Sequence, residues 1–243
     1  MYINSDWWWQ DFENVSSTND IAYEFSFNPP DSQYVISAKR QTSGRGRRGR
    51  SWQSLDGNLF FSLVLQASNE LINHLPFICS LALKDTILSL KADIDITFKW
   101  PNDVLIEGAK ISGILLEKAA NNYLIIGIGV NLMVAPEDKD IIYPTTFLKK
   151  YDIDIDRYKF LQQYLQFFDV LLLEWKQNGS AYINQKWLLH AIGLGKKIII
   201  NTEKTSHEGI FSGIDNNGAL LLDNNGQISK IYAGDVFIKP ESK

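Results

Sequence analysis

The segment Gly44-Arg-Gly-Arg-Arg-Gly-Arg-Ser51, called the basic loop below, constrains the fold of this chain more than any other. Its glycines match the G-x-G-x-x-G pattern, and its end nearly matches a P-loop, with arginine in place of lysine. Both motifs require a helix directly after the glycines. Here Trp52 leads instead into Asn58–Gln66, a run of apolar and aromatic residues that is typical of a strand. The basic loop is therefore predicted to join this strand to an earlier one over Tyr34–Ala38.

The basic loop holds most of the arginine in the chain. Five of the six arginines lie between Arg40 and Arg50, and with Lys39 this window has six cations and no carboxylate. Glycines let backbone amides approach an anion closely, and guanidinium groups bind carboxylate or phosphate with two parallel hydrogen bonds. We therefore expect the loop to repel itself when empty and to become ordered when an anionic ligand binds.

The rest of the chain is acidic. The protein has 24 cations and 28 anions, a net charge of −4, so the residues outside Lys39–Arg50 carry −10. A solvated turn or a nucleic-acid contact is the alternative interpretation of the loop, but a body of this charge repels a phosphate backbone. A small anionic ligand fits the charge distribution better.

The composition is that of a folded globular protein. Of the 243 residues, 45% are hydrophobic and 12% aromatic, which excludes a disordered chain and allows one large domain with a small companion. The single cysteine, Cys79, can form neither an internal disulfide nor a cysteine-based metal site, which favours a reducing compartment. The most apolar run, Tyr123–Ala135, contains two glycines and is too short to span a membrane. We expect a cytoplasmic protein without a signal peptide.

Helix and strand patterns alternate along the first part of the chain. The turns Glu107-Gly108 and Asn121-Asn122 predict antiparallel pairing of the strands around them. The expected strands lie over Trp7–Val15, Tyr34–Ala38, Asn58–Gln66, Ile96–Trp100 with an extension over Val104–Ile106, Ile111–Glu117 and Tyr123–Leu132. The expected helices run from the caps at Ser16–Asp20 through Phe25, and over Leu71–Ala92, Arg157–Gln177 and Ser180–Leu189.

The pattern changes to short strands after Gly193-Leu-Gly195. Five strand-like segments follow, separated by turns such as Asp215-Asn-Asn-Gly218 and Asp223-Asn-Asn-Gly226. Such a series predicts a small β-barrel. We expect an α+β fold: a mixed, largely antiparallel sheet packed with helices over residues 1–192, and a small C-terminal barrel over residues 193–243.

A second polar cluster follows the long predicted helix. The segment Lys99-Trp-Pro-Asn-Asp103 is expected to bend sharply at its proline. Lys110 then begins an otherwise apolar or small segment, so its ammonium can point into a pocket floored by Gly113. Each lysine alone is typical of a strand end, but together with the basic loop they indicate a site for an anion.

Five motifs occur in a characteristic order along the chain. They are Ser17-Thr-Asn19, Gln41-Thr-Ser-Gly44 with the basic loop and Trp52, Lys99–Asp103, Lys110–Leu115, and Gly127-Ile-Gly-Val-Asn131. In this order and spacing the chain resembles the biotin-protein ligases, and Gly213–Leu222 resembles their SH3-like C-terminal domain. The motifs begin close to residue 1, so the resemblance is to the monofunctional type without an N-terminal DNA-binding domain.

The resemblance implies a two-step reaction. Biotin would attack the α-phosphate of ATP to give biotinyl-5′-AMP, and a lysine of a biotin carboxyl carrier protein, such as that of acetyl-CoA carboxylase, would then accept the biotinyl group. Catalytic roles are implied for Lys110, Arg45, Arg47 and Asp103. Lys110 would bridge the biotin carboxylate and the α-phosphate, both arginines would order the loop over the intermediate, and Asp103 would orient or deprotonate the incoming lysine.

The resemblance also implies which residues bind the substrates. The biotin site would comprise Ser17, Thr18, Asn19, Gln41, Gly44, Arg45, Gly46, Arg47, Trp52, Lys110 and Gly113. The ATP site would comprise Arg45, Arg47, Arg48, Arg50, Lys99, Asn102, Lys110 and Asn131. No metal site made of protein ligands alone is expected, and Mg²⁺ would enter with ATP near Asn131. Tyr143 and Phe147 are both candidates for stacking on adenine, and the sequence does not choose between them.

The expected partners are biotin, Mg-ATP and the carrier protein, with no nucleic acid, no membrane and no permanent cofactor, in a monomer or a homodimer. Two alternatives stay open. A lipoate-protein ligase would share the fold, although such ligases do not carry the basic loop and Lys99–Asp103 in this form. A nucleic-acid-binding module would use the loop and the barrel, although the barrel strands lack an aromatic and basic pattern.

Overall fold

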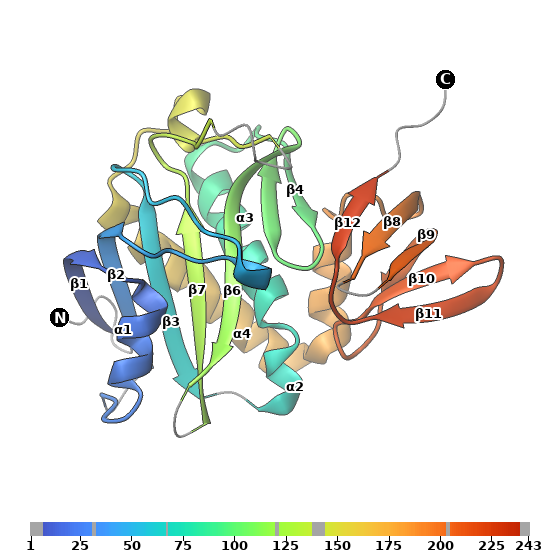
Figure 1. Cartoon of the computed structure of the whole chain (residues 1–243), viewed down its shortest axis with the longest axis horizontal. Helices are drawn as coiled ribbons and strands as arrows, with labels where there is room; N and C mark the ends of the chain where they lie inside the picture. The colour runs from blue at the N-terminus through green and yellow to red at the C-terminus, as the bar shows by residue number, and fades with distance from the viewer. Residues whose placement is uncertain are drawn as a thin grey trace.

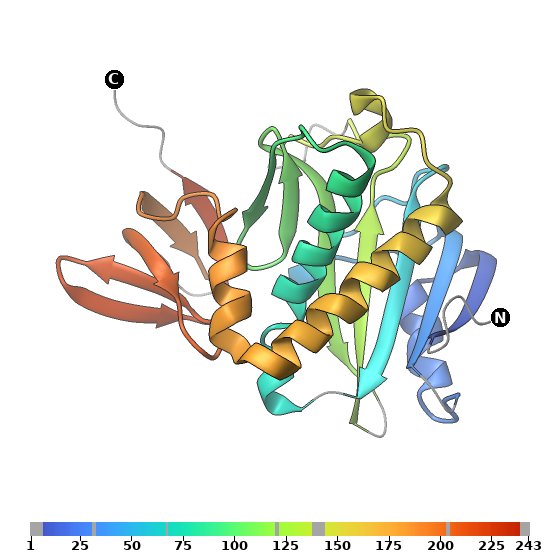
Figure 2. The ribbon, with the colours of Figure 1, turned by 180° about the vertical axis from the view of Figure 1, so that it is seen from behind.

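The computed structural model describes residues 7–30, 33–66, 68–119, 122–137, 144–202 and 205–238. Its larger unit contains the strands β1 (Trp7–Val15), β2 (Gln33–Gln41), β3 (Leu59–Gln66), β4 (Ile96–Lys99), β5 (Asp103–Ile106), β6 (Ala109–Lys118) and β7 (Tyr123–Val130). Its helices are α1 (Thr18–Phe25), α2 (Asn69–Ile72), α3 (Leu75–Leu90) and α4 (Arg157–Leu188). The strands form one sheet in the order β1-β2-β3-β7-β6-β5-β4. Helices α3 and α4 cover one face, and α1 and the basic loop lie on the other (Figures 1 and 2).

The sheet is mixed and largely antiparallel, which confirms the predicted fold class. β1 runs parallel to β2, and the other neighbouring strands of the described sheet pair antiparallel. A parallel pair needs a crossover connection, and α1 lies in the crossover between β1 and β2. α1 packs against β2, β3 and β7. These contacts place the helix over the β1 side of the sheet, as far as its central strand β7 (Figure 1).

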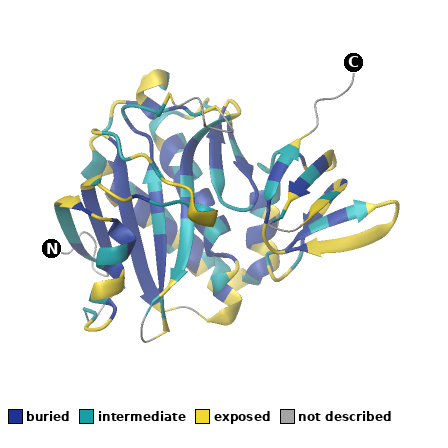
Figure 3. Cartoon of the chain, in the orientation of Figure 1, coloured by how far each residue is buried: buried dark blue, intermediate teal, exposed yellow. Residues whose placement is uncertain are grey.

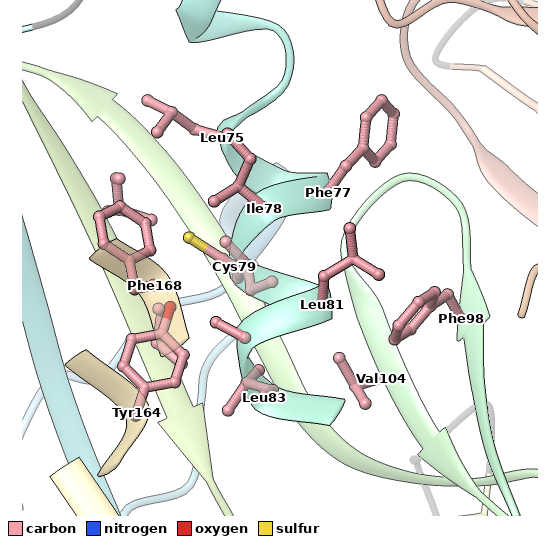
Figure 4. Close-up of a cluster of buried hydrophobic side chains, with 14 of the residues drawn as sticks. Leu75, Phe77, Ile78, Cys79, Leu81, Leu83, Phe98, Val104, Tyr164 and Phe168 are labelled. Carbon is pink, nitrogen blue, oxygen red and sulfur yellow. The ribbon is translucent and has the colours of Figure 1, made fainter. Parts of the chain in front are cut away.

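The main hydrophobic core lies between the sheet and helices α3 and α4. Burial is densest along β3 and on the inner face of α3 (Figure 3). Side chains of α3 such as Leu75 and Ile78 lie near Tyr164 and Phe168 of α4 (Figure 4). Cys79 is fully buried in this core, and burial raises the pKa of its thiol to about 12.

The single helix predicted over Leu71–Ala92 is wrong in one respect, because two helices form there. α2 ends at Ile72 and α3 begins at Leu75, with Pro76 in its first turn. Proline lacks an amide proton and is tolerated where a helix begins. The apolar residues keep a helical spacing on both sides of this break, so the spacing alone does not reveal that a new helix starts at the proline.

The strand predicted over Ile96–Trp100 and its extension over Val104–Ile106 form the two arms of a hairpin. β4 and β5 pair antiparallel, with Lys99 opposite Asp103. The turn between them contains a cis peptide bond between Trp100 and Pro101. The expected bend at the proline is thus a full reversal of the chain, and it brings Lys99 and Asp103 side by side.

Helix α4 bends sharply at Gly179 (Figure 2). Gly179 has a φ of +78° and a ψ of −177°, a conformation that favours glycine and interrupts the helix. The prediction of two helices that meet at Asn178-Gly179 is confirmed. The first begins at the cap Asp156, whose carboxylate accepts from the amides of Tyr158 at 2.9 Å and Lys159 at 3.2 Å.

The smaller unit confirms the expected series of short C-terminal strands. These are β8 (Lys197–Asn201), β9 (Ser206–Ile214), β10 (Leu220–Asn224), β11 (Gln227–Ile231) and β12 (Asp235–Ile238), in the sheet order β11-β10-β9-β8-β12. Asn184 Nδ2 of α4 donates to the Asp215 carbonyl at 2.9 Å, and Trp100 Nε1 donates to the Gly218 carbonyl at 3.4 Å. These bonds join the two units. None of the helices in the described ranges is both long and apolar enough to cross a membrane.

Candidate active site

Glycines on two neighbouring strands form the floor of a pocket above the sheet. Gly113 of β6 pairs with Gly129 of β7, and Gly127 lies two residues before Gly129 on the same face. A Cβ atom at Gly129 would lie 2.4 Å from the Trp52 ring, and one at Gly127 would lie 2.3 Å from Asn19 Oδ1. These positions must therefore lack side chains, because Trp52 and Asn19 pack directly on the backbone.

One end of the pocket is lined with buried hydroxyl and amide groups. Ser17 caps α1, and its Oγ accepts from the Asn19 amide at 3.3 Å. Gln41 Oε1 accepts from the backbone amide of Thr18 at 2.9 Å and from its hydroxyl at 3.2 Å. Ser62 Oγ donates to Asn19 Oδ1 at 2.6 Å and lies 2.8 Å from Thr18 Oγ1. The structure thus brings together all four residues predicted from Ser17 to Gln41.

The other end of the pocket is charged. Lys110 Nζ lies 2.6 Å from Asp103 Oδ1, and both side chains are mostly buried. The ammonium also lies 5.4 Å from the centre of the Trp52 ring, within range of a cation–π interaction. Trp52 therefore lines the pocket between its polar and charged ends, which makes it a wall of the site as well as a packed residue.

Nine of the predicted substrate-binding residues line this pocket. They are Ser17, Thr18, Asn19, Gln41, Arg45, Gly46, Trp52, Lys110 and Gly113. Gly44 and Arg47 are not among its lining residues. Gly44 instead packs against the returning arm of the loop, where a Cβ atom would lie 2.6 Å from the Trp52 carbonyl oxygen.

The arginines of the basic loop have carboxylate or amide partners from distant parts of the chain. Arg45 donates to both oxygens of Glu117, from Nε at 3.1 Å and from Nη2 at 3.0 Å, and its Nη1 lies 2.6 Å from Asp20 Oδ1. The hydrogen bond to Glu117 raises the pKa of Arg45 and outweighs the effect of its burial. The expectation that the loop repels itself is therefore wrong for the described structure. That expectation considered the loop alone, whereas carboxylates from other parts of the chain neutralise three of its four arginines.

The remaining loop arginines face the hairpin and the C-terminal unit. Arg47 donates from Nη1 to Asn102 Oδ1 at 2.9 Å, and burial lowers its pKa. Arg48 and Arg50 share Asp235 of β12, at 3.0 and 2.9 Å. Burial alone would raise the pKa of Asp235, but the hydrogen bond and charge of Arg50, with the other arginines, hold it below its usual value. The predicted ATP residues Arg47 and Asn102 are thus in contact, and β12 holds the end of the loop.

Two more predicted ATP residues are buried near this region. Lys99 is 6% exposed and lies 5.6 Å from the Phe237 ring, and burial lowers its pKa to about 8. Asn131 is 2% exposed, and its Nδ2 donates to the Thr146 carbonyl at 3.0 Å. Asn131 does not line the pocket, and this bond ties the end of β7 to the segment that starts at residue 144.

That segment also contacts the start of β6. The Lys110 amide donates to the Pro144 carbonyl at 2.8 Å, and the Thr146 amide donates to the Lys110 carbonyl at 2.9 Å. Phe147, one of the two adenine candidates, follows directly and is half-buried. Tyr143, the other candidate, lies outside the described residues. Within the described ranges, no three His, Cys, Asp or Glu side chains gather into a metal site.

The matches to family models define the class of protein. The model of the biotin/lipoate A/B protein ligase family matches residues 12–131, which contain the basic loop and the glycine floor. The model of the biotin protein ligase C-terminal domain matches residues 193–239. Fold and site together are those of a cofactor-attaching ligase.

Individual relatives narrow that class. The chain is 34% identical over 234 residues to the biotin--[acetyl-CoA-carboxylase] ligase of Paracoccus denitrificans, covering 92% of this chain and 97% of that one. It is also 34% identical to the bifunctional ligase/repressor BirA of Bacillus subtilis, covering 91% and 71%. The structure of the Aquifex aeolicus biotin protein ligase with biotin and ATP superposes with a TM-score of 0.83 at 27% identity, covering 97% and 99%. The chain therefore belongs to the biotin protein ligase family.

Sequence reasoning missed the acidic partners of the loop and the buried hydroxyl of Ser62, which contacts the pocket residues Thr18 and Asn19. Glu117 could have been found, because it lies on the same face of its strand as Gly113, four residues away. Ser62 is the one polar side chain in the interior of the predicted strand Asn58–Gln66, and a lone polar residue among apolar neighbours could have been noticed. Asp20 and Asp235 gave no local signal, since only the folded chain brings them to the loop.

Proposed function

We propose that this chain attaches biotin to a lysine of a biotin carboxyl carrier protein, with ATP as the source of energy and biotinyl-5′-AMP as the intermediate. One observation carries the proposal: a single pocket has the hydroxyl and amide groups of Ser17–Asn19 and Gln41 at one end and Lys110, which is paired with Asp103, at the other. A neutral urea ring requires directional hydrogen bonds, and a carboxylate requires a cation. Biotin carries these two groups at opposite ends.

In the first step, a biotin carboxylate oxygen would attack the α-phosphorus of ATP while the bond to pyrophosphate breaks. Two anions must meet, so their repulsion has to be offset as the new bond forms. We assign this role to Lys110 at the charged end and to Arg47, whose guanidinium reaches the neighbouring Asn102. Lys99, Arg48, Arg50 and Asn131 are proposed for the nucleotide side, and Mg²⁺ would arrive bound to the ATP phosphates.

In the second step, the neutral amine of the carrier lysine would attack the acyl carbon, and AMP would leave. The attacking nitrogen must lose a proton, and Asp103 is proposed to orient the amine or accept that proton. Arg45 ties the loop to α1 and β6 through Asp20 and Glu117. A loop held in this way would cover the mixed anhydride and exclude water, which would otherwise hydrolyse it.

The test is incubation of the protein with biotin, Mg-ATP and a carrier domain, followed by mass spectrometry. We expect one biotinyl group on the carrier, and no carrier adduct together with no enzyme-bound adenylate would refute the proposal. Lys110→Ala should slow adenylate formation about 10²- to 10³-fold, by analogy with loss of one transition-state donor. Lipoate in place of biotin is the matched control, and a product with lipoate alone would assign the chain to the other branch of the family.

A further inference from the structure

Glu117 lies at the wall between the pocket and the base of the basic loop. Side chains alternate along a strand, so Gly113, Leu115 and Glu117 of β6 share one face, and the first two line the pocket. The Glu117 side chain is 32% exposed, so it lies at the rim of the pocket instead of in open solvent.

Glu117 receives hydrogen bonds from two sides. Arg45 binds it through both carboxylate oxygens, at 3.1 and 3.0 Å, and Asn19 Nδ2 donates to its Oε2 at 2.6 Å. Arg45 also contacts Asp20 at 2.6 Å, so this guanidinium is neutralised by two carboxylates of the chain itself. Of the two residues that bind Glu117, Asn19 is therefore the one through which Glu117 can act on a ligand, since Asn19 lines the pocket and is only 3% exposed.

A carboxylate fixes the direction of the Asn19 side chain because it can only accept hydrogen bonds. The Asn19 amino group must face Glu117, so its Oδ1 must face Ser62, whose hydroxyl donates at 2.6 Å. Ser62 has one proton, and that proton is used for Asn19. Thr18 Oγ1, 2.8 Å from Ser62, must then donate its own proton to Ser62 or to Gln41. The charge of Glu117 thus sets the direction of the hydrogen bonds through the polar corner of the pocket, which is the group formed by Thr18, Asn19, Gln41 and Ser62.

We propose that Glu117, with Arg45 as its counter-ion, is a positioning residue for biotin recognition that holds the Asn19 amide in one orientation. The inference rests on the proposed function, since the polar corner is where the urea ring would bind. A urea offers one acceptor and two donors in a fixed arrangement. A corner whose hydrogen bonds point the wrong way leaves buried polar groups unpaired, and this weakens binding strongly.

Glu117→Gln tests the proposal because it keeps the shape but can present either a donor or an acceptor to Asn19. We expect the KM for biotin to rise about 10- to 100-fold, the range for losing one or two directional hydrogen bonds. The kcat at saturating biotin should fall by a smaller factor than this KM rises, because Asp20 still holds Arg45, and the KM for ATP should change less than about threefold. Glu174→Gln is the matched control, since Glu174 pairs with Lys186 at 2.6 Å with similar exposure, away from the pocket.

A swap of donor and acceptor provides the second measurement. Asn19→Asp places two carboxylates against each other and should abolish measurable biotin affinity. Adding Glu117→Gln restores a donor opposite an acceptor, while the other oxygen of the new aspartate still accepts from Ser62. The double variant should therefore bind biotin at least about tenfold more tightly than Asn19→Asp alone, a coupling that independent sites do not produce.

Each result has a defined meaning when thermal unfolding shows that the variants fold. A biotin KM within threefold of the unmodified chain for Glu117→Gln, or a double variant no better than Asn19→Asp, would overturn the role of Glu117. An equal loss of kcat and of ATP affinity would also overturn it, because that would indicate general damage. Failure of the unmodified chain to bind biotin would instead refute the proposed function itself.

Discussion

Lys99 is almost fully buried and lies opposite Asp103 in the β4–β5 hairpin, where its ionisation responds to pH. Burial lowers its pKa to about 8. The negative charges of Asp103 and Asp235 raise the pKa, but they offset only part of the effect of burial. An ordinary lysine stays charged to pH ~10. The unfolded chain thus binds more protons than the folded chain between pH ~8 and ~10, so this group makes the free energy of unfolding increase with pH across that window.

ATP binding should show the opposite trend if Lys99 contacts the nucleotide phosphates. Between pH 7 and 9 the ammonium changes from mostly charged to mostly neutral, so the apparent affinity for ATP should fall as the pH rises. Binding at pH ~8 should take up protons, since a phosphate favours the charged form. Titration calorimetry in buffers of different ionisation enthalpy measures this uptake. Lys99→Arg, which stays charged, should flatten the pH dependence, and an equally steep profile in that variant would assign the titration to another group.

Gly129 should tolerate no side chain without loss of ligand binding. A Cβ atom there would lie 2.4 Å from Trp52 Cε2, so Gly129→Ala must displace the indole that forms the pocket wall. We expect biotin affinity to fall by about tenfold or more, measured by titration calorimetry. Gly209→Ala is the control. Gly209 lies in the C-terminal sheet, away from the pocket, and a Cβ atom there would be similarly crowded, at 2.6 Å from the Asp223 carbonyl oxygen. That variant should lose stability but keep its biotin affinity, and a similar affinity loss in both would remove the special role of Gly129.

The basic loop depends on an element from the opposite end of the chain. Asp235 of β12 binds Arg48 and Arg50, the second of these across 185 positions of sequence. Asp235→Asn removes the charge from both contacts. We expect faster tryptic cleavage after Arg48 and Arg50 in the ligand-free variant, and protection of these sites by biotin with ATP.

Asp56→Asn is the matched control for that experiment. Asp56 pairs with Arg40 of β2 at 2.6 Å, close to the ends of the basic loop but in a far more exposed position, where ion pairs contribute little. Cleavage after Arg48 and Arg50 should be unchanged in this variant. If both variants are cut at the same rate as the unmodified chain, β12 does not restrain the loop.

Regular elements were predictable where one physical signal dominated. Trp7–Val15 has the predicted bounds, because its β-branched and aromatic residues leave no competing interpretation there. The break between α2 and α3 was missed since apolar spacing continues through Pro76, and spacing alone carries no information on where a helix starts. The sharp bend at Trp100-Pro101 was predicted, but the pairing of its two arms as a hairpin was not, because both arms are short and equally apolar.

The site was predictable in its cations and hydroxyls but not in its carboxylates. The arginines and Lys110 lie within recognisable motifs, and a motif is a local property of the sequence. Glu117, Asp20 and Asp235 become relevant only through contacts between strands or between units. Charge partners of this kind depend on the three-dimensional arrangement, which the sequence pattern does not report directly.

At the scale of the molecule, we propose a division at residue 193 into a catalytic unit over residues 1–192 and a small β unit over residues 193–243. Gly193 and Gly195, with φ of +81° and +74°, form the connection. The second unit is not a loose appendage, since Asn184 and Trp100 donate to its backbone and Asp235 holds the basic loop. The catalytic pocket and the C-terminal sheet should therefore respond to each other.

The charge of the whole molecule predicts no affinity for nucleic acid. The net charge is −4, and three of the four arginines of the basic loop are paired with Asp20, Glu117 or Asp235. A polyanion would have to displace these carboxylates and approach an acidic body. Fluorescence anisotropy with labelled duplex DNA at low salt should show no saturable binding. Binding that weakens steeply with added salt would contradict this expectation.

The burial of Cys79 has a practical consequence for following the loop in solution. This is the single thiol in the sequence, and it lies in the core with a pKa of about 12. Reagents such as maleimides react with exposed thiolates, so the folded chain is effectively unreactive toward them. One cysteine introduced at exposed Ser43 would thus take a fluorophore at a single known position. Because Cys79 does not react in the folded chain, the fluorescence signal would come from the loop position alone, and no native residue has to be removed first.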